Sequence, residues 1–145
     1  MENIRNELKL FDGIIKEIDA LYSELARRSG LSDSSFWVLY YLTQLEEEIT
    51  QKSICEQWAL SKQTVNNAIN DLLKKGYIYL LESKSDRRSK EIFLTESGER
   101  FTEIHIKKIF SIEESIFSEM SREERANIIN SNKKYLNLLR KELQK

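Results

Sequence analysis

The sequence contains no proline, four glycines, one cysteine and one histidine among its 145 residues. Proline and glycine interrupt helices and supply turns, so their scarcity predicts long helices joined by few turns. A single cysteine excludes an internal disulfide framework and is typical of a reducing compartment. One cysteine and one histidine are also too few for a metal centre built from these ligands, so we expect neither a metal nor a cofactor.

Long apolar runs are missing as well. The first residues mix charged with apolar side chains, and no stretch approaches the roughly 20 apolar residues that span a membrane. We therefore expect a cytoplasmic protein without a membrane partner. Its apolar content of 40% and its mixed charges, 32% of all residues, are typical of one folded unit rather than a disordered chain.

Charge is unevenly distributed along the chain. The net charge is −1, but residues 50–95 hold eight Lys or Arg against five Asp or Glu, a local charge of +3 that leaves −4 for the remainder. A basic middle between acidic ends is typical of a local nucleic-acid-binding surface.

Apolar periodicity predicts three helices in the first 60 residues. The first ends near Gly30 and carries a stripe of coiled-coil type, the second begins at Ser32 or Asp33, and the third begins after Thr50. We expect Cys55 to be a buried, inert thiol in the third helix, with a redox-sensing role as the alternative. The first stripe consists of Ile4, Leu8, Phe11, Ile15, Ile18, Tyr22 and Leu25.

A fourth helix and a hairpin follow. Ser61 is a good N-cap residue, and Gly76 stands where a helix C-terminus favours glycine. Residues 78–81 and 91–94 resemble two short strands around a polar, charged connection, which predicts a β-hairpin. Thr95 then caps a fifth helix that extends to Met120, and Ser121 with Glu124 forms a capping box for a sixth.

Helix, helix, helix and hairpin, in this order, predict a winged helix-turn-helix. The major groove of DNA admits one helix whose solvent face carries short polar side chains, and a basic hairpin tip suits phosphates and the minor groove. Asp86 would not bind DNA but could hold an arginine in position. The predicted DNA-binding residues are Ser61, Lys62, Gln63, Thr64, Asn66, Asn67 and Asn70 on the helix and Lys84, Arg87, Arg88 and Lys90 on the hairpin.

Several of these segments resemble the MarR family of bacterial regulators. Asp86-Arg87-Arg88 and Leu94-Thr95-Glu96-Ser97-Gly98 are similar to the family's wing pattern of Asp, any residue, Arg, then a strand and Leu-Thr-x-x-Gly. Residues 60–65 and 72–78 resemble its recognition helix and the exit from that helix. Two positions depart from the pattern, because Asn67 stands where many members carry Arg and Ala59 where a turn glycine is common.

The resemblance implies a homodimer that binds a pseudo-palindromic operator in double-stranded DNA, most simply as a ligand-responsive repressor. It implies that Arg88 enters the minor groove and that Asp86 orients it. It also divides the chain into a winged-helix region, residues 31–95, and a helical dimerisation region, residues 1–30 and 96–145, within one mainly α-helical (α+β) folding unit.

Other functions remain open at this point. Trp37, Tyr40, Tyr41 and His105 are candidates for a pocket that binds a small aromatic effector, although such side chains more often form ordinary core. A winged-helix protein-interaction module that never touches DNA is the alternative function. An enzyme is disfavoured, because the sequence has no Gly-rich phosphate loop, nucleophile elbow or metal-spaced ligands.

Overall fold

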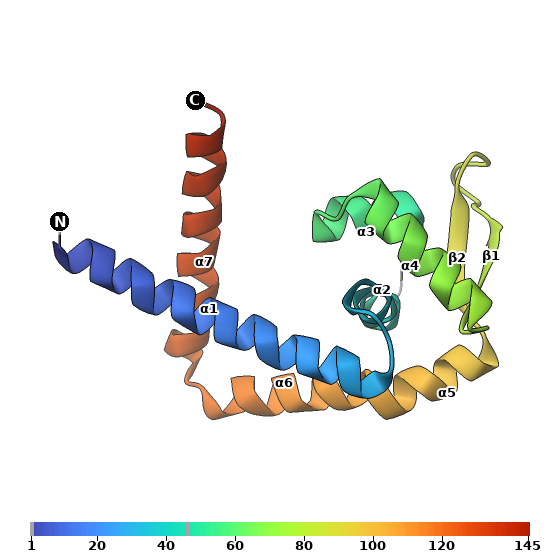
Figure 1. Cartoon of the computed structure of the whole chain (residues 1–145), viewed down its shortest axis with the longest axis horizontal. Helices are drawn as coiled ribbons and strands as arrows, with labels where there is room; N and C mark the ends of the chain where they lie inside the picture. The colour runs from blue at the N-terminus through green and yellow to red at the C-terminus, as the bar shows by residue number, and fades with distance from the viewer. Residues whose placement is uncertain (1, 46) are drawn as a thin grey trace. The chain divides into compact units, whose positions relative to one another are not determined.

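The structure is a computed structural model that describes residues 2–45 and 47–145 (Figure 1). Within these residues it contains seven helices and one two-stranded antiparallel sheet, which confirms the expected mainly helical class with a β-hairpin wing. The elements are α1 (Glu2–Ser29), α2 (Asp33–Gln44), α3 (Gln51–Trp58), α4 (Lys62–Lys74), β1 (Ile78–Glu82), β2 (Lys90–Leu94), α5 (Glu96–His105), α6 (Lys107–Glu119) and α7 (Arg122–Leu143).

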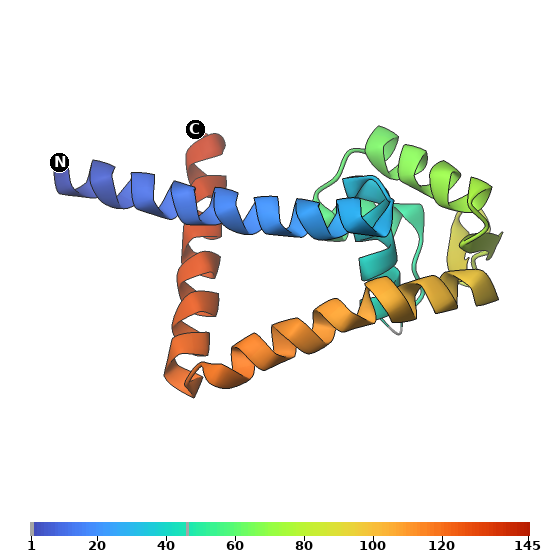
Figure 2. The same ribbon diagram turned by 60° about the horizontal axis from the view of Figure 1, so that its bottom comes forward.

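The chain forms two compact units, Met1–Ile106 and Lys107–Lys145. In the first unit, α4 packs against α2 and α3, and the hairpin lies beside α4 (Figures 1 and 2). Phe36, Leu39 and Leu72 are completely buried between these elements. Burial of each such side chain contributes about 1.5–3 kcal/mol, so this core determines how α4 is held.

The predicted helix starts are confirmed by their caps. At five positions a hydroxyl accepts a hydrogen bond from the backbone N–H three residues later, which satisfies a group that the helix itself leaves unpaired. Ser121 completes its capping box with Glu124, and Thr50 forms a second box with Ser53. The capping residues are Ser32, Thr50, Ser61, Thr95 and Ser121.

Gly76 ends α4 in the way the sequence predicts. Its φ of 74° lies in the left-handed region, where glycine has no Cβ to clash. The N–H of Gly76 donates to Leu73 O and that of Tyr77 to Leu72 O, both at 3.0 Å. This paired pattern is a Schellman motif, and it turns the chain directly from α4 into β1.

Gly98 has a different reason to be glycine. A Cβ at this position would lie 2.0 Å from the carbonyl oxygen of Tyr77. The N–H of Thr95 donates to that same oxygen at 3.0 Å. The start of α5 therefore packs directly against the backbone that leads into β1, and this contact holds the base of the hairpin.

The hairpin pairs β1 with β2 from Ile78 opposite Leu94 to Glu82 opposite Lys90. The connection between α2 and α3 runs along the other edge of β2, where the N–H of Ile92 donates to Ile49 O at 2.8 Å and Thr50 forms an isolated bridge with Glu91. The hairpin is thus fixed to the helical core along its second strand.

The prediction of one helix from Thr95 to Met120 is wrong, because Ile106 interrupts it. Ile106 has a φ of −102°, about 40° from the ideal helical value, while its N–H still donates to Thr102 O. No proline or glycine marks the break. Ile106 is completely buried, so side-chain packing overrides a local sequence that favours an unbroken helix.

Candidate nucleic-acid interface

The polar face of α4 is presented to solvent as predicted. Val65, Ala68 and Ile69 are buried against the core, which turns the opposite side of the helix outward. Thr64 is half-buried, whereas the other predicted side chains of this helix are exposed. The exposed set is Ser61, Lys62, Gln63, Asn66, Asn67 and Asn70.

Two hydrogen-bonded pairs of side chains lie on this face of α4. The Ser61 hydroxyl caps the helix and lies 2.8 Å from the Thr64 hydroxyl, so both groups are used locally. Further along, Gln63 Nε2 donates to Asn67 Oδ1 at 3.0 Å. This contact fixes the orientation of both amides and leaves the Gln63 oxygen and the Asn67 amino group outward for a partner.

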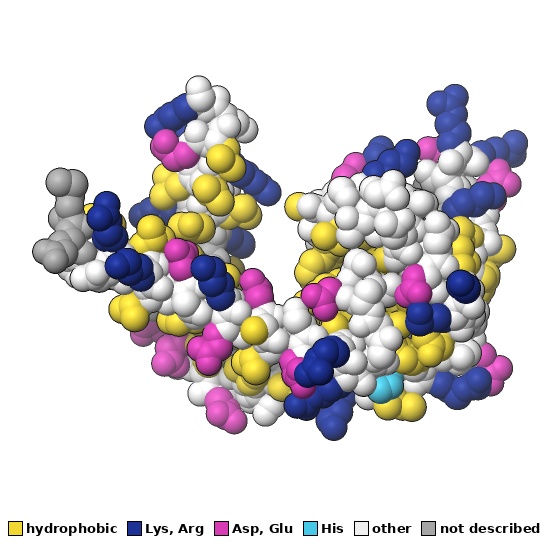
Figure 3. Space-filling view, viewed as in Figure 1, with side chains coloured by type: hydrophobic (Ala, Val, Ile, Leu, Met, Phe, Trp, Pro, Cys, Tyr) yellow, Lys and Arg dark blue, Asp and Glu magenta, His cyan; other side chains and the backbone are white. Residues whose placement is uncertain are grey.

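The wing is the hairpin of β1 and β2, and its tip is the connection formed by residues 83–89. Lys84, Arg87 and Arg88 at the tip and Lys90 at the start of β2 are all exposed. Figure 3 shows the dark blue side chains that gather at this end of the hairpin. Arg87 Nε lies 3.9 Å from Glu82 Oε1, whereas Arg88 forms no ion pair with any residue that the structure describes.

Asp86 organises the tip through the backbone. Its Oδ1 accepts a hydrogen bond from the N–H of Arg88 at 2.9 Å, and its carbonyl oxygen accepts from the N–H of Ser89 at 3.0 Å. The expected partner of the Asp86 carboxylate was an arginine, and the structure places the contact at the Arg88 main chain. The carboxylate thus shapes the turn, and the guanidinium of Arg88 has no hydrogen bond or ion pair with the residues that the structure describes.

A cavity of about 600 Å³ lies between α3, α4 and the wing. Four cations line it, namely Lys52, Lys62, Arg88 and Lys90. Cys55 lines it as well and is half-buried, so the expectation of a buried thiol is wrong. α3 is eight residues long, and Cys55 stands on the side of it that lines this cavity. Glu56 is the acidic residue of the lining, so the cavity surface carries four cations against one carboxylate.

Glu48 is a residue of this region that the sequence analysis missed. Its carboxylate accepts hydrogen bonds from the hydroxyls of Ser83 and Ser85. These two hydroxyls lower the pKa of Glu48 below its ordinary value against an opposing effect of burial, and the Ser85 backbone and the charge of Lys84 add smaller contributions in the same direction. No sequence pattern connects a loop glutamate with serines 35 and 37 positions later.

The four candidate effector-pocket residues fall into two aromatic groups. Trp37 lies 5.1 Å from Tyr40 and 5.3 Å from Trp58, while Tyr41 lies 6.2 Å from Trp58, measured between ring centroids. His105 instead contacts Phe101 at 4.5 Å, which in turn contacts Tyr77. Trp58 Nε1 is buried and finds no hydrogen-bond partner among residues 2–45 and 47–145. None of the four candidates lines the cavity beside the wing.

The described residues contain no group of three His, Cys, Asp or Glu side chains that could hold a metal ion. Among the helices formed by residues 2–45 and 47–143, none has the length and apolar character required to cross a membrane.

Three helices followed by a hairpin, with a polar face on the third and a cationic tip on the hairpin, define a winged helix-turn-helix protein. The family model described as "MarR family" matches residues 29–89. The HTH-type transcriptional regulator SarZ of Staphylococcus haemolyticus is 32% identical over 119 residues, which cover 80% of this chain and 77% of that protein.

Solved structures agree with this class. NMB1585, a MarR family regulator from Neisseria meningitidis, is 25% identical with a TM-score of 0.79, over 95% of this chain and 96% of that one. The S. aureus MepR–DNA complex is 25% identical with a TM-score of 0.72, over 92% and 97% of the two chains. The chain belongs to the MarR family of winged helix-turn-helix transcriptional regulators, which are DNA-binding proteins and not enzymes.

Proposed function

We propose that the protein acts as a homodimeric, cytoplasmic repressor that binds a pseudo-palindromic operator. In this proposal α4 enters the major groove and the wing reaches the adjacent minor groove. The observation that carries it is the exposed, cationic wing tip beside the exposed amide face of α4. The S. aureus MepR structure, which is similar over nearly the whole chain, is a complex with DNA.

The amides of α4 would read base edges. Asn and Gln can donate to and accept from adenine in the major groove, so Gln63, Asn66, Asn67 and Asn70 favour half-sites that contain A·T pairs. Lys62, which stands at the first turn of α4, would contact a phosphate, and Ser61 and Thr64 would hold the N-terminus of α4 against the DNA backbone.

The wing would contribute a positively charged arm. Arg88 has no competing carboxylate among the described residues, so its guanidinium is available for the negative potential of a narrow minor groove. Lys84, Arg87 and Lys90 would contact flanking phosphates. Asp86 would maintain the turn that presents Arg88, since it bonds to the Arg88 main chain.

A second copy of the chain would cover apolar side chains that this copy leaves exposed. On α1, Ile4 is 70% exposed and Leu8 47%, and on α7, Leu136 is 44% and Leu139 43% exposed. Large apolar surfaces of this kind mark protein interfaces. We propose that residues 1–30 and 96–145 supply the dimer interface and that residues 31–95 bind DNA.

A small aromatic ligand would regulate binding through the cluster around Trp37. Tyr40, Tyr41 and Trp58 offer ring faces for stacking, and Trp58 Nε1 offers a buried N–H for which the described part of the chain supplies no acceptor. His105, whose ring contacts Phe101, would not belong to this aromatic cluster. Phenols and aromatic carboxylates are therefore the compounds to screen, by their effect on the thermal unfolding midpoint and on operator affinity.

The decisive experiment is the selection of bound duplexes from a random library, followed by affinity measurements at several salt concentrations. A palindromic consensus with half-sites about one helical turn apart is expected. Arg88→Ala should weaken binding and lower the slope of log affinity against log salt by about 1. Arg87→Ala should have a smaller effect on binding, because the Arg87 side chain already lies near the Glu82 carboxylate. If the unchanged protein shows no salt-dependent retention on duplex DNA, a protein-interaction module replaces this proposal.

A further inference from the structure

One of the attachments of the wing to the rest of the first unit is a short segment, residues 48–50. Backbone contacts of Ile49 and Thr50 hold β2, but they lie along the strand and do not reach the tip. Glu48 is the residue of this segment whose side chain extends to residues 83–89. Its two carboxylate oxygens accept from two different serines, so neither oxygen can rotate away without breaking a hydrogen bond.

The contacts of Glu48 are of a strong type. Ser85 Oγ donates to Glu48 Oε2 at 2.7 Å, and Ser83 Oγ donates to Glu48 Oε1. Hydrogen bonds to an ionised acceptor are roughly twice as strong as those between neutral groups. Ser83 is only 3% exposed, although it stands at the beginning of an exposed and highly charged connection. Glu48 therefore binds the one part of the tip that is buried.

Ser83 passes this restraint on to the rest of the tip. Its hydroxyl accepts from the N–H of Asp86 at 3.2 Å, and its own N–H donates to Ser89 O at 3.1 Å. Asp86 in turn accepts from the N–H of Arg88. A continuous set of hydrogen bonds thus leads from the Glu48 carboxylate through Ser83 and Asp86 to the main chain of Arg88.

The charge of Glu48 makes its role distinguishable. A carboxylate beside Lys84 and the other cations of the tip opposes the approach of phosphates, so electrostatics alone predict that its removal strengthens DNA binding. Loss of the hydrogen bonds to the serines predicts the reverse, because the tip would no longer be ordered before binding. The sign of the change separates the two effects.

We infer that Glu48 is a positioning residue for DNA binding, which holds the wing tip through Ser83 and Ser85 in the conformation that presents Arg88. The inference rests on the proposed DNA-binding function, but its structural part concerns the free protein. Glu47 provides the matched control, since it is an exposed acid in the same loop with none of these contacts.

The test compares Glu48→Ala with Glu47→Ala in the full-length protein. Glu48→Ala should weaken affinity for the selected duplex by about tenfold, the equivalent of one charge-assisted hydrogen bond, while Glu47→Ala should leave it unchanged or slightly tighter. In an Arg88→Ala background the effect of Glu48→Ala should largely disappear, although these two side chains share no contact. A purely stabilising role would not produce that coupling.

Hydrogen exchange of the free protein supplies a readout that does not depend on DNA. The amides of Asp86 and Arg88 should exchange faster in Glu48→Ala and in Ser83→Ala. In the double variant with both substitutions, these amides should exchange no faster than in either single variant. Unchanged exchange at both amides, or duplex affinity equal to that of Glu47→Ala, would overturn the inference. If the unchanged protein binds no duplex, the proposed function fails, and the exchange measurement still decides whether Glu48 orders the tip.

Discussion

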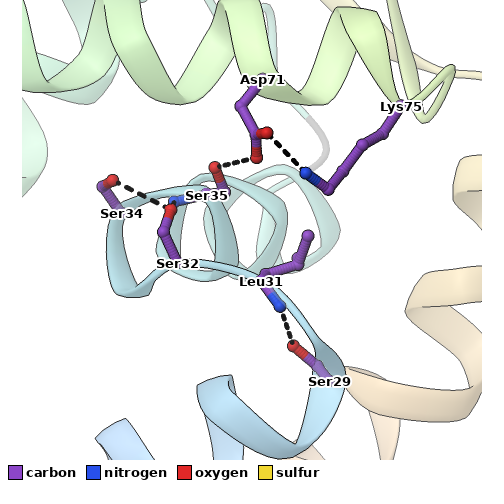
Figure 4. A network of polar contacts seen from close by, with 7 residues as sticks. All are labelled: Ser29, Leu31, Ser32, Ser34, Ser35, Asp71 and Lys75. Carbon is purple, nitrogen blue, oxygen red and sulfur yellow. Dashed lines mark hydrogen bonds and ion pairs between the residues drawn. The ribbon is translucent and has the colours of Figure 1, made fainter.

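The Ser35 hydroxyl donates a hydrogen bond of 2.8 Å to Asp71 Oδ2, and this contact joins α2 to α4 (Figure 4). Ser35 is completely buried, and the other oxygen of Asp71 accepts from Lys75 one turn further along α4. Asp71 thus stands on the flank of α4 that faces α2, one turn after Asn67 and beside the amide face. The contact restrains the rotation of α4 about its axis and hence the direction in which that face points.

Replacement of Asp71 by alanine should destabilise the protein by about 1–2 kcal/mol, because the buried Ser35 hydroxyl loses its acceptor. Asp71→Asn keeps an oxygen that can accept from Ser35, so its free energy of unfolding should fall by less. Denaturant unfolding followed by circular dichroism measures both variants. Equal stability of Asp71→Ala and the unchanged protein would show that Ser35 finds another acceptor at no cost.

The same carboxylate should contribute to acid sensitivity. The hydrogen bond from the Lys75 ammonium lowers the pKa of Asp71 below its ordinary value of 3.8. Burial opposes this as the second-largest effect, and the Ser35 hydroxyl lowers the pKa further. A lowered pKa in the folded state stabilises the protein above the unfolded pKa, and this stabilisation is lost as pH falls through the folded value. Between about pH 5 and pH 3, the free energy of unfolding should therefore fall more steeply in the unchanged protein than in Asp71→Asn.

Gly98→Ala should destabilise the protein by about 1–3 kcal/mol, because the new methyl group would displace the backbone at Tyr77. Gly13 in α1 is the matched control, since a Cβ there meets no described atom within 4 Å other than those of its chain neighbours and of the surrounding helix backbone. Gly13→Ala should instead stabilise the helix by about 0.5–1 kcal/mol. Thermal unfolding of the two variants should shift the midpoint in opposite directions, and a shift of the same sign would contradict the packing argument.

Ala59→Gly should stabilise the protein. Ala59 follows α3 with φ 51° and ψ 33°, in the left-handed region where a Cβ costs about 1–2 kcal/mol. Glycine removes that strain but adds freedom to the unfolded chain, so a net gain of about 0.5–1 kcal/mol is expected. A loss of stability would mean that the Ala59 methyl group contributes packing that outweighs the strain.

Lys62 and Asn67 should affect DNA binding differently. Lys62→Ala should weaken binding to all duplexes alike and reduce the salt slope by about 0.9, as expected for one lost phosphate contact. Asn67→Ala should keep the salt slope but relax the preference at one base pair of each half-site, by about 1–3 kcal/mol. Competition binding with single-base variants of the selected operator separates the two patterns, and a base-specific effect of Lys62→Ala would reverse the assignment.

Local chemistry accounts for the parts of the fold that could be predicted from sequence. A hydroxyl before an amphipathic helix and a glycine after it act within a few residues, so Thr95 and Gly76 indicated where α5 begins and α4 ends. Ile106 and Cys55 depart from prediction because burial depends on residues far away in the chain. The same applies to Glu48 and Ser83, whose contact becomes visible only when the loop and the hairpin have both been placed.

The aromatic cluster of α2 and α3 gives the protein an internal optical probe. The chain has two tryptophans, and the rings of Trp37 and Trp58 lie 5.3 Å apart, with Tyr22 and Tyr40 also in contact with Trp37. Intrinsic fluorescence excited at the indole band therefore arises from this one location. Any event that separates α1, α2 and α3, or that brings a quenching compound to the Trp58 ring, changes the emission without a label attached to the protein.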